Sequence, residues 1–166
     1  MRIFAPARFL DQSTQPHIAT LIALASISAL AMNIFLPSLP SMAAYYNTTP
    51  SMMSLSVAIY LGASALLQLF SGPISDRIGR RPVILISLIL FIIASLATIW
   101  APNAETFLAL RFVHAFAATA MVLSRAVVRD TVGKEAAASK IAYVTMGMAV
   151  APMIGPGIGG YLDKYF

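Results

Sequence analysis

Long apolar runs without a single charge alternate with short polar segments along this chain. No Asp, Glu, Lys or Arg occurs between residues 12 and 75. Four charged residues then fall between Asp76 and Arg81, and a further uncharged run extends from residue 82 to residue 104. A helix needs about 20 predominantly apolar residues to cross a hydrocarbon core of roughly 30 Å. The pattern therefore predicts an all-α membrane protein.

Five segments are long enough and apolar enough to cross a bilayer. We predict membrane-spanning helices over residues 18–36, 52–74, 82–100, 103–128 and 140–162. Pro37 and Pro40 are expected to break the first helix, and Pro82 suits the first turn of the third. Because every linker is short, successive helices should be antiparallel neighbours.

The composition supports this fold class and narrows the function. Hydrophobic residues make up 59% of the 166 residues and charged residues only 10%, whereas ordinary globular domains carry about 25%. The chain has no cysteine, which excludes disulfides and thiolate chemistry. The sequence has no recognisable metal-ligand cluster, nucleophile–base pair or phosphate-binding loop. We therefore expect no enzyme activity, no cofactor and no bound metal.

The net charge of +5 arises from basic residues that gather on one side of the predicted spans. Eight Lys or Arg residues fall on the N-terminal side, and only Lys164 falls in a segment on the opposite side. An excess of Lys and Arg marks cytoplasmic loops. We therefore predict a multi-pass protein of the inner (plasma) membrane, with a cytoplasmic segment at residues 1–16 and no nucleic-acid partner. The eight residues are Arg2, Arg8, Arg77, Arg80, Arg81, Arg129, Lys134 and Lys140.

The charged hairpin after the second span combines glycines, an acid and several arginines. Gly72 is expected to admit a neighbouring helix and Gly79 to supply a turn. Asp76 and Arg80 are expected to pair with each other or with charges at the end of the fourth span. We interpret this segment as a gating loop, the alternative being a loop that only fixes the topology. Its residues are Gly72, Asp76, Arg77, Gly79, Arg80 and Arg81, with Arg129 and Asp130 on the same side.

A stripe of small residues runs along the fifth predicted span. Its members recur every four residues, which lets two helix backbones approach closely. Two prolines within the stripe free backbone carbonyls and permit a bend. We expect this face to form a tight helix pair. The residues are Gly147, Ala151, Gly155 and Gly159, with Pro152, Pro156 and Gly160 beside them.

An arginine and a histidine lie within the fourth predicted span. Arg111 comes eight residues after Asn103, so it lies about 12 Å along the helix, and His114 shares its face. A charge at this depth is costly and indicates a functional site, unless the side chain snorkels outward to Glu105 or to lipid headgroups. His114 either carries a proton or serves as a packed hydrogen-bonding residue.

Polar residues of the first two spans complete the candidate pathway. Tyr60, Ser64 and Gln68 recur at intervals of four on the second span. They either line a polar path or form hydrogen bonds between helices. Asn33 lies near the end of the first span. No Asp or Glu lies in the hydrocarbon part of any predicted span.

Four motifs resemble the major facilitator superfamily of secondary transporters. The segment at residues 72–81, Gly-x-x-x-Asp-Arg-x-Gly-Arg-Arg, resembles its signature loop. The run Ala-Pro-Met-Ile-Gly-Pro-Gly-Ile-Gly-Gly at 151–160 is similar to the antiporter motif of proton-linked drug exporters. Residues 111–115 are similar to the fourth-helix motif, with His114 in place of Gln. Residues 33–40 resemble the bicyclomycin and chloramphenicol resistance branch of drug:proton antiporters, with Asn33 where these often have Asp.

The resemblance implies a fold of twelve helices in two six-helix halves, with substrate bound between the halves. Residues 17–166 then form an incomplete first half that contains helices one to five. It also implies that Asn33, Tyr60, Gln68, Arg111 and His114 face a central pathway for substrate and protons. An amide such as Asn33 does not titrate, so proton coupling would need His114 or a residue outside this chain.

We therefore predict a secondary transporter that exports drugs or other small lipophilic molecules in exchange for protons. Alternating access needs two halves that move around a site. We expect the chain to be truncated or split, inactive alone, and dependent on the missing second half or another membrane protein. The alternatives are a non-transporting membrane subunit that pairs through its small-residue face, and a nutrient or sugar carrier of the same fold.

Overall fold

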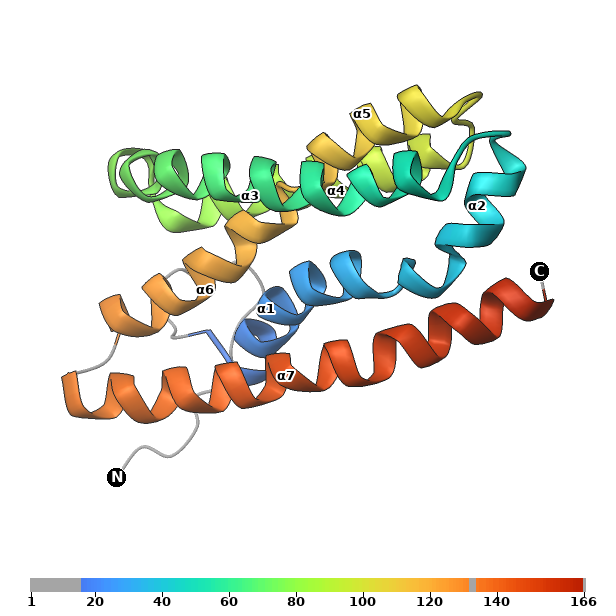
Figure 1. Cartoon of the computed structure of the whole chain (residues 1–166). Coiled ribbons are helices and arrows are strands. Elements are labelled where there is room, and N and C mark those ends of the chain that lie inside the picture. Colours follow the sequence, from blue (N-terminus) through green and yellow to red (C-terminus); the bar gives the residue numbers. More distant parts are fainter. Residues whose placement is uncertain (1–15, 132–133, 166) are drawn as a thin grey trace.

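A computed structural model describes residues 16–131 and 134–165, and all its regular elements are helices (Figure 1). The cytoplasmic segment predicted for residues 1–16 lies, up to residue 15, outside the described residues. The elements are α1 (Ile18–Asn33), η1 (Leu36–Ser38), α2 (Leu39–Tyr45), α3 (Pro50–Ile78), α4 (Arg80–Thr98), α5 (Ala104–His114), α6 (Ala117–Thr131) and α7 (Lys134–Tyr165).

The prediction of five membrane-spanning helices is confirmed. Within the described residues, five helical segments are long and apolar enough to cross a bilayer. Their ends differ from the predicted ones because helical structure continues past the apolar runs: α3 extends to Ile78 and α7 begins at Lys134. The five segments are Ile18–Tyr45, Pro50–Ile78, Arg80–Thr98, Ala104–Thr131 and Ala136–Tyr165.

The charged hairpin between the second and third spans is almost entirely helical. Gly79 alone separates α3 from α4. Its φ of 97° and ψ of 151° fall in a region that is nearly confined to glycine. The prediction that Gly79 makes the turn is therefore confirmed. Pro82 lies in the first turn of α4, where a missing N–H costs nothing.

The first span is interrupted, as its prolines predict. α1 ends at Asn33, earlier than residue 36, and the chain passes through η1 before it resumes as α2. Pro37 and Pro40 lack the N–H that a continuing α-helix requires, and each lies in the first turn of a new element. The break therefore leaves carbonyl groups of α1 without helical partners.

The fourth span is also interrupted, which the sequence did not predict. Its helix was expected to run without a break over residues 103–128, but α5 ends at His114 and α6 begins at Ala117. Between them, Ala115 and Phe116 donate their N–H groups three residues back, to Phe112 and Val113. Such bonds tighten the helix locally. No Gly or Pro lies at this break, so local sequence carries no signal for it.

α1, α6 and α7 pack together in one group. Figure 1 shows α7 running beside α1, and α6 contacts both helices. Leu21, Ala25, Val128 and Val144 form a buried cluster where these three helices meet. α3, α4 and α5 contact one another in a second group (Figure 1). The polar residues that concern function lie where α1 meets this second group.

Candidate functional site

Arg111 is buried at the junction of α1, α3 and α5, with only 4% of its surface exposed. Its Nη1 and Nη2 atoms each donate a hydrogen bond to the carbonyl oxygen of Ala31, at 3.2 Å. The snorkelling alternative is wrong, because the guanidinium group points inward to α1. We call Arg111 and the residues that surround it, Ser28, Phe35, Tyr60, Ser95 and His114, the Arg111 cluster.

The Ala31 carbonyl accepts these bonds because α1 ends two residues later. In a continuous helix this oxygen would bond to the N–H of residue 35, which lies beyond the end of α1. The last carbonyls of a helix also carry negative partial charge. Arg111 therefore caps the C-terminal end of α1 from a helix 80 residues away in sequence.

Two aromatic rings complete the surroundings of the guanidinium group. Its Cζ atom lies 3.9 Å from the ring centre of Phe35 and 5.2 Å from that of Tyr60. Ring faces attract cations. No carboxylate of the described residues forms an ion pair with Arg111. A helix end and two ring faces therefore balance its charge where a carboxylate usually does.

His114 links Arg111 to α4, and its contacts define which ring nitrogen carries the proton. Nδ1 lies 3.4 Å from Nη1 of Arg111, which only donates, so Nδ1 is the acceptor. The proton is then on Nε2, which donates to Ser95 Oγ at 3.1 Å. Ser95 Oγ donates onward to the carbonyl of Phe91 at 2.8 Å. The ring is thus neutral in this arrangement.

Tyr60 joins α3 to α1 through its hydroxyl group. This group donates to the carbonyl of Ser28 at 3.0 Å. Because its single proton is used there, it accepts from Ser28 Oγ at 2.9 Å. The sequence left two roles open for the polar residues of the second span, lining a polar path or forming hydrogen bonds between helices. Tyr60 has the second role.

Three of the five residues predicted to line one pathway lie together, and the other two lie apart. Tyr60, Arg111 and His114 are buried together. Gln68 is half-buried and lies eight residues farther along α3, about 12 Å from Tyr60. Asn33 is also separate, although it lies close in sequence to the α1 residues that contact Arg111.

Asn33 faces α7. Its Nδ2 atom donates to the carbonyl of Ala29 on its own helix at 2.7 Å. Its Cβ atom lies 3.8 Å from the position that a Cβ on Gly155 would take. Asn33 therefore packs toward α7 within this chain, and its place on the pathway stays a prediction.

Arg80 connects Ser75, Asp76 and Asp130, and we call these four residues the Arg80 cluster. It pairs with Asp76 four residues before it, and its Nε donates to Asp130 Oδ2 at 3.0 Å. Its Nη1 atom donates to Ser75 Oγ. The predicted pairing of the hairpin with the end of the fourth span is confirmed for Asp130. One guanidinium group thereby connects the ends of α3, α4 and α6.

The remaining hairpin residues contribute less than expected within this chain. No atom of another described helix lies within 4 Å of the position that a Cβ on Gly72 would take, so the expected close helix approach is wrong here. Arg77, Arg81 and Arg129 are exposed.

The stripe of small residues on α7 packs directly on α1. A Cβ on Gly159 would lie 1.6 Å from the carbonyl oxygen of Ile34, and one on Gly147 would lie 2.5 Å from Cγ2 of Ile22. Ala151, between them, is buried. The predicted tight helix pair is confirmed, with α1 as its partner.

The prolines of the stripe do not end α7. The helix is continuous from Lys134 to Tyr165 through Pro152 and Pro156. At the far end of the stripe, the position of a Cβ on Gly160 lies 3.6 Å from Cβ of Pro37. α7 therefore follows the broken first span past the end of α1.

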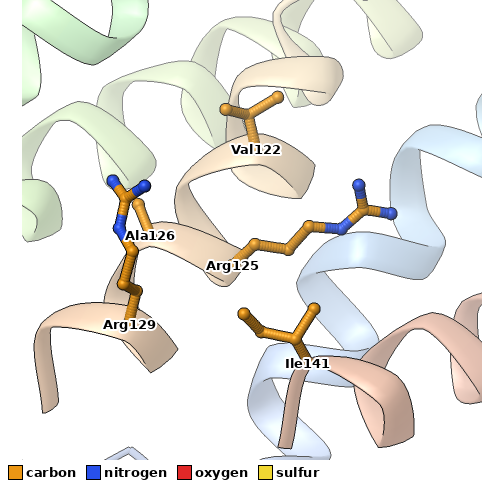
Figure 2. A pocket seen from close by; sticks show the side chains of 5 residues that line it. All are labelled: Val122, Arg125, Ala126, Arg129 and Ile141. Carbon is orange, nitrogen blue, oxygen red and sulfur yellow. The ribbon is translucent and has the colours of Figure 1, made fainter. Parts of the chain in front are cut away.

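A second arginine within the fourth span, Arg125, was missed by the sequence analysis. It lines a hollow between α6 and α7 together with Arg129 and three apolar residues (Figure 2). Its Nε atom is buried without a hydrogen-bond partner, and its Nη2 lies 3.8 Å from Met148 Sδ. The signal was present, because an arginine inside an apolar run is itself unusual.

This arrangement of five long apolar helices, with broken first and fourth spans and a small-residue helix pair, is that of a membrane-spanning protein. The chain belongs to the Major Facilitator Superfamily, which it matches over residues 21–166. Members of this superfamily are multi-pass membrane transporters and are not enzymes.

Similar proteins include several named for drug resistance. The chain is 36% identical over 143 residues to the chloramphenicol resistance protein of Pseudomonas aeruginosa, which covers 84% of this chain and 34% of that protein. It is 32% identical over 157 residues to a bicyclomycin resistance protein homolog of Haemophilus influenzae, with 94% and 39% covered. It is 31% identical over 144 residues to multidrug resistance protein D of Escherichia coli, with 86% and 36% covered. The chain thus spans about a third of the length of the curated relatives it matches.

Proposed function

We propose that this chain provides the first five helices of a proton-coupled exporter of drugs or other small lipophilic molecules in the inner membrane. The observation that carries the proposal is the Arg111 cluster, which lies at the broken end of α1 in a chain whose relatives are named for multidrug and chloramphenicol resistance. A buried cation at a helix break is a position where ligands and coupling ions act in secondary transporters.

The contacts of His114 suggest how a proton acts on this cluster. A proton on Nδ1 would place two positive charges at the 3.4 Å that separates it from Arg111. Protonation therefore requires the guanidinium group to leave Nδ1. Because Nη1 also donates to Ala31, the same movement weakens the cap on α1, although Nη2 has its own bond there. Proton binding therefore disfavours the fully capped state of α1, and such a difference between two states is the requirement for coupling.

The remaining motifs take supporting roles in this proposal. The Arg80 cluster latches the cytoplasmic ends of α3, α4 and α6, and a second half of the transporter docks against it. The close packing of α7 on α1 restricts leak along the pathway. Because alternating access needs two bundles that move around a site, transport requires further helices beyond these five.

The alternative of a non-transporting subunit loses support from the packing of α7. That hypothesis assigned the small-residue stripe to an external partner. α1 of the same chain occupies the stripe, with Gly159 against the Ile34 carbonyl. A nutrient or sugar carrier of the same fold remains as the competing substrate class.

A chimeric transporter tests the proposal. The five helices of this chain replace the equivalent helices of the Pseudomonas aeruginosa chloramphenicol resistance protein, in bacteria that lack efflux pumps. We expect lower accumulation of a fluorescent lipophilic cation and higher chloramphenicol resistance than with empty vector, and a protonophore should abolish both. The 166-residue chain alone should have no effect.

Matched variants separate coupling from folding. Arg111→Gln in the chimera should abolish the protonophore-sensitive efflux, whereas Phe112→Ala, at an adjacent exposed position, should retain it. The proposal fails if the chimera reaches the membrane at the level of its parent but lowers neither drug nor dye accumulation. Inhibition of the dye efflux by sugars rather than lipophilic cations would support the competing substrate class.

A further inference from the structure

Ser95 contacts the functional histidine from α4, and the proposed transport mechanism gives it no role. It lies in an uncharged stretch that extends from residue 82 to residue 104. Ser95 is half-buried, and its Oγ atom lies 3.1 Å from Nε2 of His114. The imidazole ring is therefore held between two helices, by Arg111 on its own helix and by Ser95 on α4.

Ser95 accepts a hydrogen bond from His114 because its own proton is used elsewhere. Its hydroxyl group donates to the carbonyl of Phe91, one turn earlier in α4, at 2.8 Å. A hydroxyl group has a single proton, so the contact with Nε2 requires a proton on the ring nitrogen. On the other side of the ring, Arg111 offers only protons to Nδ1. The two contacts therefore favour the same tautomer.

The contact with Ser95 is the stronger of the two. N–H···O hydrogen bonds are usually about 2.7–3.2 Å long. The 3.1 Å between His114 and Ser95 falls in this range, whereas the 3.4 Å between His114 and Arg111 exceeds it. The ring of Phe91 packs beside the imidazole, with the ring centres 5.5 Å apart, and its carbon atoms offer no acceptor. His114 is buried, so bulk water competes little with Ser95 for the ring proton.

We propose that Ser95 is a positioning residue for His114. It holds the ring proton on Nε2 and thereby keeps Nδ1 unprotonated and turned toward Arg111. A further proton then enters at Nδ1, the atom that Arg111 contacts. Ser95 thus makes proton binding and the Arg111 contact compete for one atom. This consequence for coupling rests on the proposed function, whereas the position of the ring proton does not.

Nuclear magnetic resonance of the full chain in micelles, with ¹⁵N-labelled histidine, tests the proposal. The chain has two histidines, and His17→Asn leaves His114 as the only labelled ring while it keeps a capping side chain on α1. At alkaline pH, where a neutral ring predominates, we expect an N–H correlation at Nε2 and none at Nδ1. Ser95→Ala should speed the exchange of the ring proton with water about fivefold, the factor that corresponds to one net hydrogen bond. It should also produce a second correlation at Nδ1.

Thr98→Val is the matched control, because Thr98 lies one turn after Ser95 in α4. Its hydroxyl group donates to the carbonyl of Ala94 at 2.7 Å and forms no hydrogen bond with His114, so its loss should leave the exchange rate unchanged. Ser95→Thr keeps a hydroxyl group and should retain the native spectrum. Ser95→Cys, whose sulfur is a weak acceptor, should be intermediate.

Three results would overturn the proposal. The first is an N–H correlation at Nδ1 in the native chain. The second is native exchange in Ser95→Ala, which would mean that Arg111 alone sets the tautomer. The third is an equal effect of Ser95→Ala and Thr98→Val, which would mean a general loosening of α4.

The consequence for coupling is measured separately in the chimera, at equal amounts of transporter in the membrane. Ser95→Ala should reduce the protonophore-sensitive efflux, and Ser95→Thr should restore it. If the unmodified chimera exports nothing, the proposed function fails, while the spectrum still decides the role of Ser95. If the Ser95→Ala chimera exports as its parent does in spite of an altered spectrum, the link between tautomer and coupling is wrong.

Discussion

Arg111 shows how one side chain stabilises a defect in another helix. The break that Pro37 imposes leaves the Ala31 carbonyl without an N–H partner inside the protein. A neutral donor would satisfy that oxygen with one bond, but the guanidinium group supplies two and adds a charge of the sign that a helix C-terminus favours. The arginine thereby acts as a structural cap and as a charged functional group at once.

Replacing Arg111 should destabilise the chain in an order that reflects this cap. Arg111→Met leaves the Ala31 carbonyl and Nδ1 of His114 without donors, and each buried unpaired group costs about 1–3 kcal/mol. Arg111→Lys keeps the charge and one donor, so it should be intermediate. Unfolding by dodecyl sulfate, followed by circular dichroism in mixed micelles, measures the free energies. If the Met variant equals the native chain in stability, burial of the cation costs as much as the cap contributes.

Gly159 should tolerate no side chain at all. A Cβ there would overlap the backbone oxygen of Ile34, which cannot move aside without displacing α1. We expect Gly159→Ala to lower the free energy of unfolding by about 3 kcal/mol, at the upper end for overpacked cores. Gly157→Ala is the control, because nothing lies within 4 Å of its Cβ position, and alanine favours a helix by about 1 kcal/mol. The same unfolding assay should show opposite signs for the two variants, and equal effects would contradict the helix contact.

At the scale of elements, the two interrupted spans are the first and the fourth. These positions correspond to one another in a repeat of three helices, the arrangement known from transporters built as inverted repeats. The two breaks face each other through Arg111, which lies in the last turn of α5 and caps α1. Broken helices expose polar backbone groups where these line a site. In this chain the exposed group is the Ala31 carbonyl, which Arg111 contacts.

The sequence predicted elements well where the signal was local. The apolar runs predicted the five spans, the prolines predicted the break after α1, and Gly79 predicted the turn between α3 and α4. The break after His114 has no proline or glycine, so local sequence carries no signal for it. The position of Asn33 also escaped prediction, because spacing along one helix does not reveal which neighbour a face meets.

Arg80 should couple energetically to Asp130, though weakly. The two side chains are 21% and 45% exposed, and ion pairs of this kind contribute about 0.2–1 kcal/mol. A double-mutant cycle with Arg80→Gln and Asp130→Asn should give a coupling energy in that range, measured by unfolding in mixed micelles. The same cycle with Arg77→Gln should give no coupling, since Arg77 is exposed. A coupling above about 2 kcal/mol would mean that the cluster is less solvated than its exposure indicates.

At the scale of the whole molecule, the described helices leave much apolar surface uncovered. Leu69, Phe70 and Met153 are 69%, 62% and 83% exposed, and α4 presents several isoleucines on one side. A soluble protein rarely has exposed apolar patches of this extent. Lipid and further helices are the surroundings that suit such a surface. The uncovered surface therefore supports the proposal that these five helices pack against lipid and further helices.

The orientation in the membrane is the remaining prediction, and the absence of cysteine makes it easy to test. We place single cysteines at two exposed neutral positions near opposite ends of the bundle, Ala44→Cys in α2 and Ile78→Cys at the end of α3. If the Lys and Arg excess faces the cytoplasm, a membrane-impermeant maleimide should label Ala44→Cys in intact cells. It should label Ile78→Cys only after the membrane is permeabilised.

The cysteine-free parent chain controls for background labelling in both conditions. Labelling of Ile78→Cys alone in intact cells would reverse the topology and place the Arg80 cluster and the Arg125 hollow at the outer surface. The gating role of that cluster would then fail, although the Arg111 cap on α1 would stand. Labelling of both positions in intact cells would mean mixed insertion. The experiment thus separates the gating role of the Arg80 cluster, which depends on orientation in the membrane, from the Arg111 cap on α1, which depends on helix packing alone.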